Sequence, residues 1–171
     1  DDLRDFRKLG RPRLFFGISA GCMDSMVNKY TANKRLRSDD AYTPDGRPDM
    51  RPEYPSIVYT QILKKLYPDV PVVLGGIEAS MRRLSHYDYW QDRLKKSILC
   101  ESGADMLIYG MGEKPICELV RRLTALCDNQ DGVISSSDIH SPALSSIPQT
   151  AYLTRKYESD ENDITLYSHE E

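Results

Sequence analysis

The chain has 171 residues, of which 40% are hydrophobic and 29% charged, and its formal net charge is −3. This length suits one domain, and the slight acidic excess excludes a general attraction to nucleic acid or acidic membranes. No apolar run approaches the roughly 18 residues of a membrane span and nothing at the start reads as a signal peptide, so we expect a cytoplasmic protein without a membrane partner.

The chain opens with a pattern typical of the end of a helix. Leu3, Phe6 and Leu9 recur at helical spacing, and Gly10 follows as a stop signal. A short apolar run after Arg-Pro then predicts a buried strand over Arg13–Ser19. Because doubly wound domains rarely open on a helix, we expect one or two strands of a longer protein to precede this chain.

Helices and strands then alternate. A helix is predicted over Tyr54–Tyr67, where Pro55 suits the first turn. The run PVVLGG, residues 71–76, is β-branched and apolar on both sides, which is typical of a strand in a sheet covered on both faces. Arg93–Cys100 is predicted to be a helix, and Ala104–Gly110 another buried strand.

The clearest helix of the chain is predicted over Glu113–Cys127. One apolar stripe marks its buried face: Ile116, Leu119, Val120, Leu123 and Cys127. Gln149–Thr154 is predicted as an edge strand. Tyr157–Glu171 holds six acidic residues and no Lys or Arg, so we expect a solvated, poorly ordered tail or linker, and one domain over residues 1–156.

This order of elements predicts an α/β fold. Strands and helices that alternate with short connections indicate an open, mostly parallel, doubly wound sheet of the flavodoxin-like kind, truncated here at its N-terminal side. In such sheets, ligands bind beyond the carboxyl ends of the strands, near the point where the strand order reverses.

Three predicted strand ends carry glycine-rich turns: SAG at 19–21, GGIE at 75–78 and GMGE at 110–113. In a parallel sheet they would converge on one rim, where backbone N–H groups and a helix N-terminus could hold a polar or phosphate-bearing ligand. The candidate cofactor-binding residues are Ser19, Gly21, Gly75, Gly76, Glu78, Gly110, Gly112 and Glu113. Alternatively, these glycines only make tight strand-to-helix turns.

The run Ala79–Ser97 follows the Gly-Gly turn and carries five basic and two acidic residues, a local net charge of +3. Its aromatic rings could stack on a planar ligand or a nucleobase. The candidate substrate-binding residues are Arg82, Arg83, His86, Tyr87, Tyr89 and Trp90. Alternatively, the run packs on the sheet with basic heads in water, and His86 is a hydrogen-bonded structural residue rather than a general base.

Two further features limit the possible functions. The long segment Thr31–Tyr54 has no periodicity and balanced charges, so closing over a ligand or docking on another domain fits it better than binding nucleic acid. The four cysteines form no CxxC pair, so we interpret them as mostly buried, reduced small hydrophobic residues and expect no metal site.

Several phrases resemble a known family. A strand ending in Gly-Gly followed by ADMLIYGMGEKPICELVRRL resembles the cobalamin-binding-type domain that precedes the catalytic barrel in many radical SAM enzymes. The closer similarity is to the YgiQ family of radical SAM proteins, over residues 1–126. It is carried by DDLRDFRKLGRP, AGCMDSMVNKYTANKRLRSDDAYTPDG, VVLGGIEASMRRLSHYDYW and ADMLIYGMGEKPICELV.

The resemblance implies a longer parent enzyme with a CxxxCxxC motif, whose four-iron, four-sulfur cluster cleaves S-adenosylmethionine. This chain contains no such motif, so we expect no cofactor and no catalysis in it alone. Cobalamin is not expected, because the usual DxHxxG loop would follow a strand absent here and SAG at Ser19 lacks the leucine of the common SxL motif.

The resulting hypothesis is an N-terminal accessory domain that contributes to the substrate or cofactor site of a radical SAM enzyme with an unknown substrate. The alternative is a non-catalytic module that binds a ligand or a partner, and RNA binding is a third candidate. The expected partners are the protein's own radical SAM domain, a small molecule, and a second copy if an exposed sheet edge self-associates.

Overall fold

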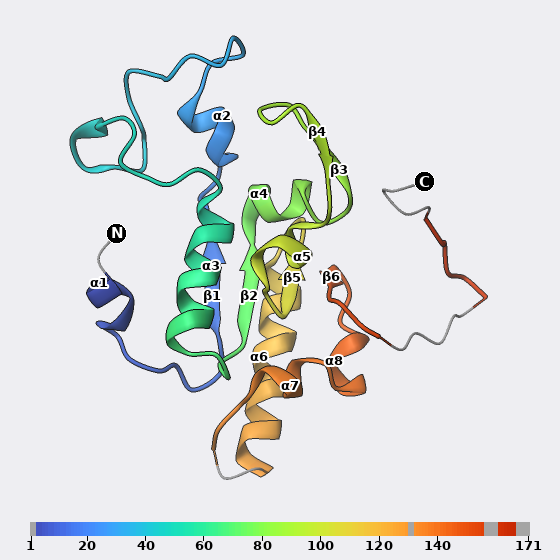
Figure 1. Cartoon of the computed structure of the whole chain (residues 1–171). Helices are drawn as coiled ribbons and strands as arrows, with labels where there is room; N and C mark the ends of the chain where they lie inside the picture. The colour runs from blue at the N-terminus through green and yellow to red at the C-terminus, as the bar shows by residue number, and fades with distance from the viewer. Residues whose placement is uncertain (1–2, 130–131, 156–160, 167–171) are drawn as a thin grey trace.

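The computed structural model describes residues 3–129, 132–155 and 161–166. Its main sheet has the strand order β1-β2-β5-β6 (Figure 1). These strands are β1 (Phe16–Ser19), β2 (Val72–Gly75), β5 (Met106–Ile108) and β6 (Thr150–Ala151). The first three run parallel, and β6 pairs antiparallel with β5. The predicted open, mostly parallel α/β sheet is confirmed.

Within the described residues, helices cover both faces of the sheet at β2 and β5. One layer holds α3 (Pro55–Leu66), α4 (Gly76–Met81) and α5 (Ile98–Ser102). The other holds α6 (Glu113–Asn129), α7 (Ser136–Ile139) and α8 (Pro142–Ser145). Consecutive residues of a strand point to opposite faces, so Leu74 of β2 packs with the first layer and Val73 with the second.

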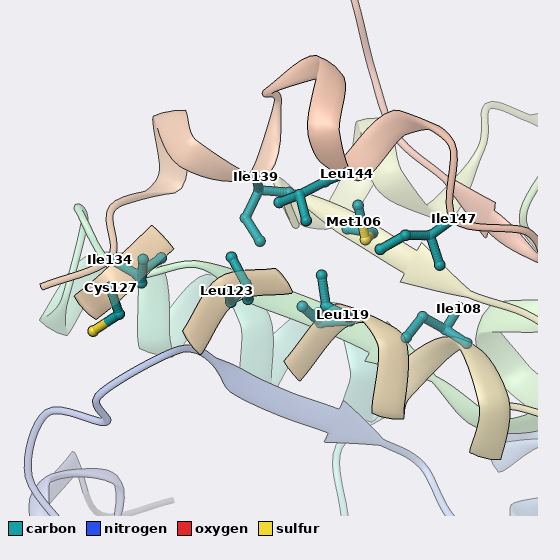
Figure 2. Packing of buried hydrophobic residues seen from close by; sticks show 10 residues of the cluster. Met106, Ile108, Leu119, Leu123, Cys127, Ile134, Ile139, Leu144 and Ile147 are labelled. Carbon is teal, nitrogen blue, oxygen red and sulfur yellow. The ribbon is translucent and has the colours of Figure 1, made fainter. Parts of the chain in front are cut away.

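The core under α6 follows from helical spacing. Leu119, Leu123 and Cys127 are fully buried, and Figure 2 shows Met106 and Ile108 of β5 packed against this helix and its neighbours. An α-helix turns by about 100° per residue. The residues three and four positions apart therefore share the buried face, which confirms the predicted stripe except at its flank, where Val120 is partly exposed.

The interpretation of the cysteines as mostly buried is wrong for three of the four. Cys22, Cys100 and Cys117 are exposed, and only Cys127 is buried. Cys117 lies two residues before Leu119, which places it on almost the opposite side of α6. Because cysteine counts as an apolar residue, the hydrophobic pattern of the sequence does not show that Cys117 faces solvent.

The helix predicted over Arg93–Cys100 is also corrected. The structure has a hairpin of β3 (His86–Asp88) and β4 (Arg93–Lys95), and α5 begins only at Ile98. The Asp88 carboxylate accepts the backbone N–H groups of Trp90 at 2.9 Å and Gln91 at 3.0 Å, which fixes the tight turn. Such a local side-chain-to-backbone bond competes with helix formation.

The remaining elements are α1 (Leu3–Arg7), α2 (Ser25–Lys29) and the 3₁₀ turn η1 (Pro44–Gly46). Of the predicted acidic tail, the structure describes only residues 161–166, which are exposed and form neither helix nor strand; the rest of that prediction lies outside the described residues. In the described part of the chain, no helix combines the length and apolar character that crossing a bilayer requires.

Candidate functional site

The glycine turns after β1, β2 and β5 surround one cavity. It has a volume of about 450 Å³ and lies at the carboxyl ends of the three parallel strands. That volume falls within the range of small-molecule sites. Six of the predicted residues line it: Ser19, Gly75, Gly76, Gly110, Gly112 and Glu113. The predicted convergence of the three turns is therefore confirmed, while their role in binding stays a prediction.

Two glycines make the floor of the cavity. Gly17 pairs with Val73, and Ser19 pairs with Gly75, in the register of β1 and β2. A Cβ atom on Gly17 would meet only Phe15 Cε2, at 3.9 Å, and one on Gly75 only the Ile108 carbonyl oxygen, at 4.0 Å. Neither position requires glycine, because a side chain would fit and the φ angle is not positive. Both glycines therefore leave the strand backbone open to the cavity.

Sequence reasoning missed Gly17. The signal was a single glycine in an otherwise apolar strand, which often marks a close approach to the backbone. The cavity is also lined by the apolar side chains of Phe15 and Ile116, which lie outside the predicted glycine motifs. The cavity is therefore more apolar than the rim of backbone N–H groups that the turns alone suggested.

Gly76 and Gly110 differ from the floor glycines, because the turns themselves require them. Gly76 has a φ of +81°, and a Cβ there would lie 2.5 Å from Ser19 Oγ. Gly110 has a φ of +70°, and its Cβ would lie 3.0 Å from Gln149 Nε2. Side chains rarely adopt this left-handed conformation. The interpretation as tight strand-to-helix turns explains these two positions.

Gly21 and Glu78 are not among the lining residues. Gly21 lies against the ring of Tyr42. Glu78 is completely buried, and its carboxylate accepts the backbone N–H groups of Ser25 and Ser56, each at 3.2 Å. These donors belong to the first turns of α2 and α3, where a negative charge is favourable. Glu78 thus joins two helices, a structural role that its position after Gly-Gly did not reveal.

Arg82 is also part of an internal contact. Its guanidinium is buried and pairs with the Asp24 carboxylate, which also caps α2 by accepting the Met26 and Val27 N–H groups. Burial acts to lower the pKa of Arg82, but the contact with Asp24 outweighs it and the pKa is raised. The pair fixes α2 to the end of α4.

The aromatic residues Tyr89 and Trp90 hold the hairpin on the long loop, residues 31–54. Tyr89 Oη donates to the Ala32 carbonyl at 2.9 Å, and the Trp90 ring lies 5.1 Å from the Tyr30 ring. Lys34 Nζ lies 4.7 Å above the Tyr89 ring and donates to the Trp90 carbonyl. Figure 1 shows the hairpin and the loop at the same end of the molecule.

The other predicted substrate-binding residues also lie outside the cavity lining. Arg83 is exposed beside the Tyr109 ring, and exposed Tyr87 donates to Asp92. His86 Nδ1 lies 3.1 Å from the Leu84 carbonyl, whereas its buried Nε2 has no partner among the described residues. A substrate contact for this group stays a prediction.

The long loop is anchored by the buried Asp40. Its carboxylate accepts Asn28 Nδ2 at 2.8 Å, the Tyr42 N–H at 2.9 Å and Arg51 Nε at 3.0 Å. Burial alone would raise the pKa of Asp40, but these donors lower it below its usual range. The segment that looked suited to closing over a ligand is thus fastened to the body of the domain at this point.

Asp40 should make the protein sensitive to acid. Because its folded pKa is lowered, its contribution is present above the unfolded pKa of about 4 and is lost as pH falls through the folded value. We expect Asp40→Asn to lower the free energy of unfolding at pH 7. We also expect the free energy of unfolding of this variant to fall less steeply below about pH 4. Urea unfolding between pH 7 and 2 measures this, with the exposed Asp39→Asn as control. If the free energy of unfolding of Asp40→Asn falls below pH 4 as steeply as that of the unmodified protein, this role of Asp40 is contradicted.

Comparisons with known proteins agree on one relationship. The family model described as Radical SAM N-terminal matches residues 1–171. A UPF0313 protein of Bacteroides thetaiotaomicron is 73% identical over 173 residues, which cover 100% of this chain and 28% of that protein. A UPF0313 protein of Porphyromonas gingivalis is 65% identical over 100% of this chain and 26% of its own length.

The UPF0313 protein YgiQ of Escherichia coli is 58% identical over 119 residues, 70% of this chain and 16% of that protein. The chain thus spans about a quarter of the length of the Bacteroides and Porphyromonas relatives. No solved structure matches.

Proposed function

Since the chain belongs to the Radical SAM N-terminal family, we propose that it is the accessory domain of a longer radical SAM enzyme and supplies part of that enzyme's small-molecule site. The observation that carries the proposal is the cavity of about 450 Å³ above the floor glycines Gly17 and Gly75. Its place beyond the carboxyl ends of parallel strands is where open α/β sheets bind ligands.

The lining favours a particular kind of ligand. The floor is bare backbone, and the walls include the apolar side chains of Phe15, Val73 and Ile116. Glu113 and Ser19 add polar atoms, and the Glu113 carboxylate occupies the start of α6, where a phosphate would otherwise be favoured. A flat, mainly apolar molecule with a hydrogen-bond donor therefore fits better than a phosphate-bearing one.

The family implies a four-iron, four-sulfur cluster and S-adenosylmethionine in the parent enzyme. The cysteines of this chain do not fit that cluster, because in the described residues no three His, Cys, Asp or Glu side chains form a group able to hold a metal. We assign no chemical step to this chain. Its partner in the proposal is the radical SAM domain of the same cytoplasmic protein, which would supply the cluster.

The contacts of the hairpin give the RNA-binding alternative little support. The Trp90 ring packs on Tyr30 and Lys34 lies over the Tyr89 ring, so these two rings are partly covered, although Tyr89 and Tyr87 stay exposed. The two buried basic residues of this run are both paired, Arg82 with Asp24 and Lys95 with Glu101. The local charge of +3 in the sequence is therefore partly neutralised inside the domain.

A series at Gly17 tests the cavity. Gly17→Ala, Gly17→Val and Gly17→Leu should fill it progressively, because Gly17 has no positive φ and a Cβ there meets only Phe15, at 3.9 Å. We expect Gly17→Leu to weaken binding at least about tenfold, a loss of about 1.4 kcal/mol, while the melting temperature is kept. Calorimetric titration of the full-length protein with adenosine, S-adenosylmethionine and hydroxocobalamin gives the affinities.

Val133→Leu is the matched control, since Val133 is exposed and lies outside the cavity lining. The control should bind as the unmodified protein does. If Gly17→Leu binds a ligand as tightly as the control does, the ligand lies elsewhere. If none of the three compounds binds the unmodified protein, these ligand classes are excluded from the site.

A further inference from the structure

One edge of the sheet has backbone groups that pair with no other strand in the part of the chain that the structure describes. β1 pairs with β2 and with no other strand among the described residues. The Phe16 N–H donates to the Pro71 carbonyl of the β2 side at 2.9 Å. In a parallel ladder the backbone groups of successive residues point to opposite sides of a strand, so the groups of Gly17 and Ser19 point toward the free edge.

The same two residues lie on a face of β1 that no described helix covers. Along β1, Phe16 and Ile18 are half-buried on the α3 side, whereas Gly17 and Ser19 are exposed on the other side. Parallel sheets are normally covered on both faces. Edge strands that remain free usually carry a charge, a proline or a bulge, and the sequence Phe-Gly-Ile-Ser of β1 has none of these.

We propose that β1 pairs along this edge with another parallel strand, contributed by the part of the full-length protein outside these 171 residues. About three quarters of the Bacteroides and Porphyromonas relatives lies outside the matched segment, so ample polypeptide exists to supply it. A parallel neighbour requires a long crossover connection, usually a helix. A right-handed connection that leads from the new strand directly into β1 places its helix on the α3 side, so covering the exposed Gly17 face requires a connection that leaves the new strand in the other direction.

A second copy of the chain fits this edge less well. Two-fold symmetry would pair the two β1 strands antiparallel, without bringing a helix to the exposed face. The four residues of β1 span only about 13 Å. Such a short contact is far from the roughly 1,200 Å² that stable interfaces bury. The proposal does not depend on any ligand, so it can hold or fail independently of the proposed function.

Amide hydrogen exchange in the full-length protein, without added ligand, tests the pairing. The Ile18 amide points toward β2 and is the internal reference. The exchange rates are resolved residue by residue. We expect the rates of the Gly17 and Ser19 amides to lie within about tenfold of the rate of the Ile18 amide. Both should be at least about 100-fold slower than in an unstructured peptide.

Two results would overturn the proposal. The first is exchange of Gly17 and Ser19 near the unstructured rate while Ile18 is protected, which would mean that the edge is free. The second is protection that disappears on dilution from 50 µM to 1 µM together with a change from dimer to monomer in light scattering. That outcome would identify a second copy at the edge instead.

Discussion

Arg82→Ala is expected to lower the free energy of unfolding by roughly 3–5 kcal/mol, the cost of leaving a buried charge without its partner. Arg82 and Asp24 are 9% and 6% exposed, and the two side chains form an ion pair between α2 and the end of α4. Removing the guanidinium, which also lies 5.5 Å from the centroid of the Tyr54 ring, leaves the Asp24 carboxylate buried with only its backbone donors. Urea unfolding at pH 7 measures the loss.

A double-mutant cycle separates the ion pair from other effects of truncation. Asp24→Asn keeps an acceptor for the α2 cap, and Arg82→Met keeps most of the buried volume. The double variant should therefore be more stable than the sum of the single losses predicts, with a coupling of about 1–3 kcal/mol. Exposed Arg83→Ala, next along the chain, is the control and should change stability by less than about 1 kcal/mol. Additive single losses would exclude a coupled pair.

The parts of the fold that repeat a local pattern could be predicted from sequence. Apolar runs between glycine turns located β1, β2 and β5, and spacing of three and four residues located α6. The hairpin could not be found this way, because its turn depends on the Asp88 carboxylate meeting the N–H groups of Trp90 and Gln91. A pattern of hydrophobic residues contains no information about that contact.

The candidate site, too, could be predicted only in part from the sequence. Parallel strands bring their carboxyl ends to one edge, so the convergence of three glycine turns followed from the fold alone. Which residues face the cavity depended on long-range contacts: Glu78 accepts the N–H of Ser25, 53 residues away, and Arg82 meets Asp24, 58 residues away. These two residues therefore stabilise the helices around the site, although their sequence positions suggested ligand binding.

The glycines of the site separate into two physical classes, and this division has a measurable consequence. Gly75 has a φ of −152°, which any residue adopts, and its Cβ would lie 4.0 Å from the nearest atom. Gly76, the next residue, has a φ of +81° and no space for a Cβ beside Ser19. The first leaves space that a ligand could use, whereas the second is required for the chain to turn from β2 into α4.

Gly76→Ala is accordingly expected to destabilise the protein by roughly 2–5 kcal/mol, through left-handed backbone strain and overpacking together. Gly75→Ala is the matched control and should change the free energy of unfolding by less than about 1 kcal/mol. Urea unfolding of both variants gives the comparison. Equal losses at the two positions would contradict the difference in backbone conformation that the structure shows.

The atom that Gly76→Ala displaces can be removed separately. Ser19 Oγ would lie 2.5 Å from the new Cβ, and in the native turn it accepts the Gly21 N–H at 3.1 Å. Ser19→Ala alone should therefore cost about 0.5–1.5 kcal/mol for the lost hydrogen bond. Combined with Gly76→Ala it should recover about 1 kcal/mol relative to additivity, but not all of the loss, because the Gly21 carbonyl oxygen at 3.3 Å and the positive φ remain. Strict additivity would mean that the contact with Ser19 contributes nothing, and that the positive φ and the Gly21 carbonyl contact require glycine at this turn.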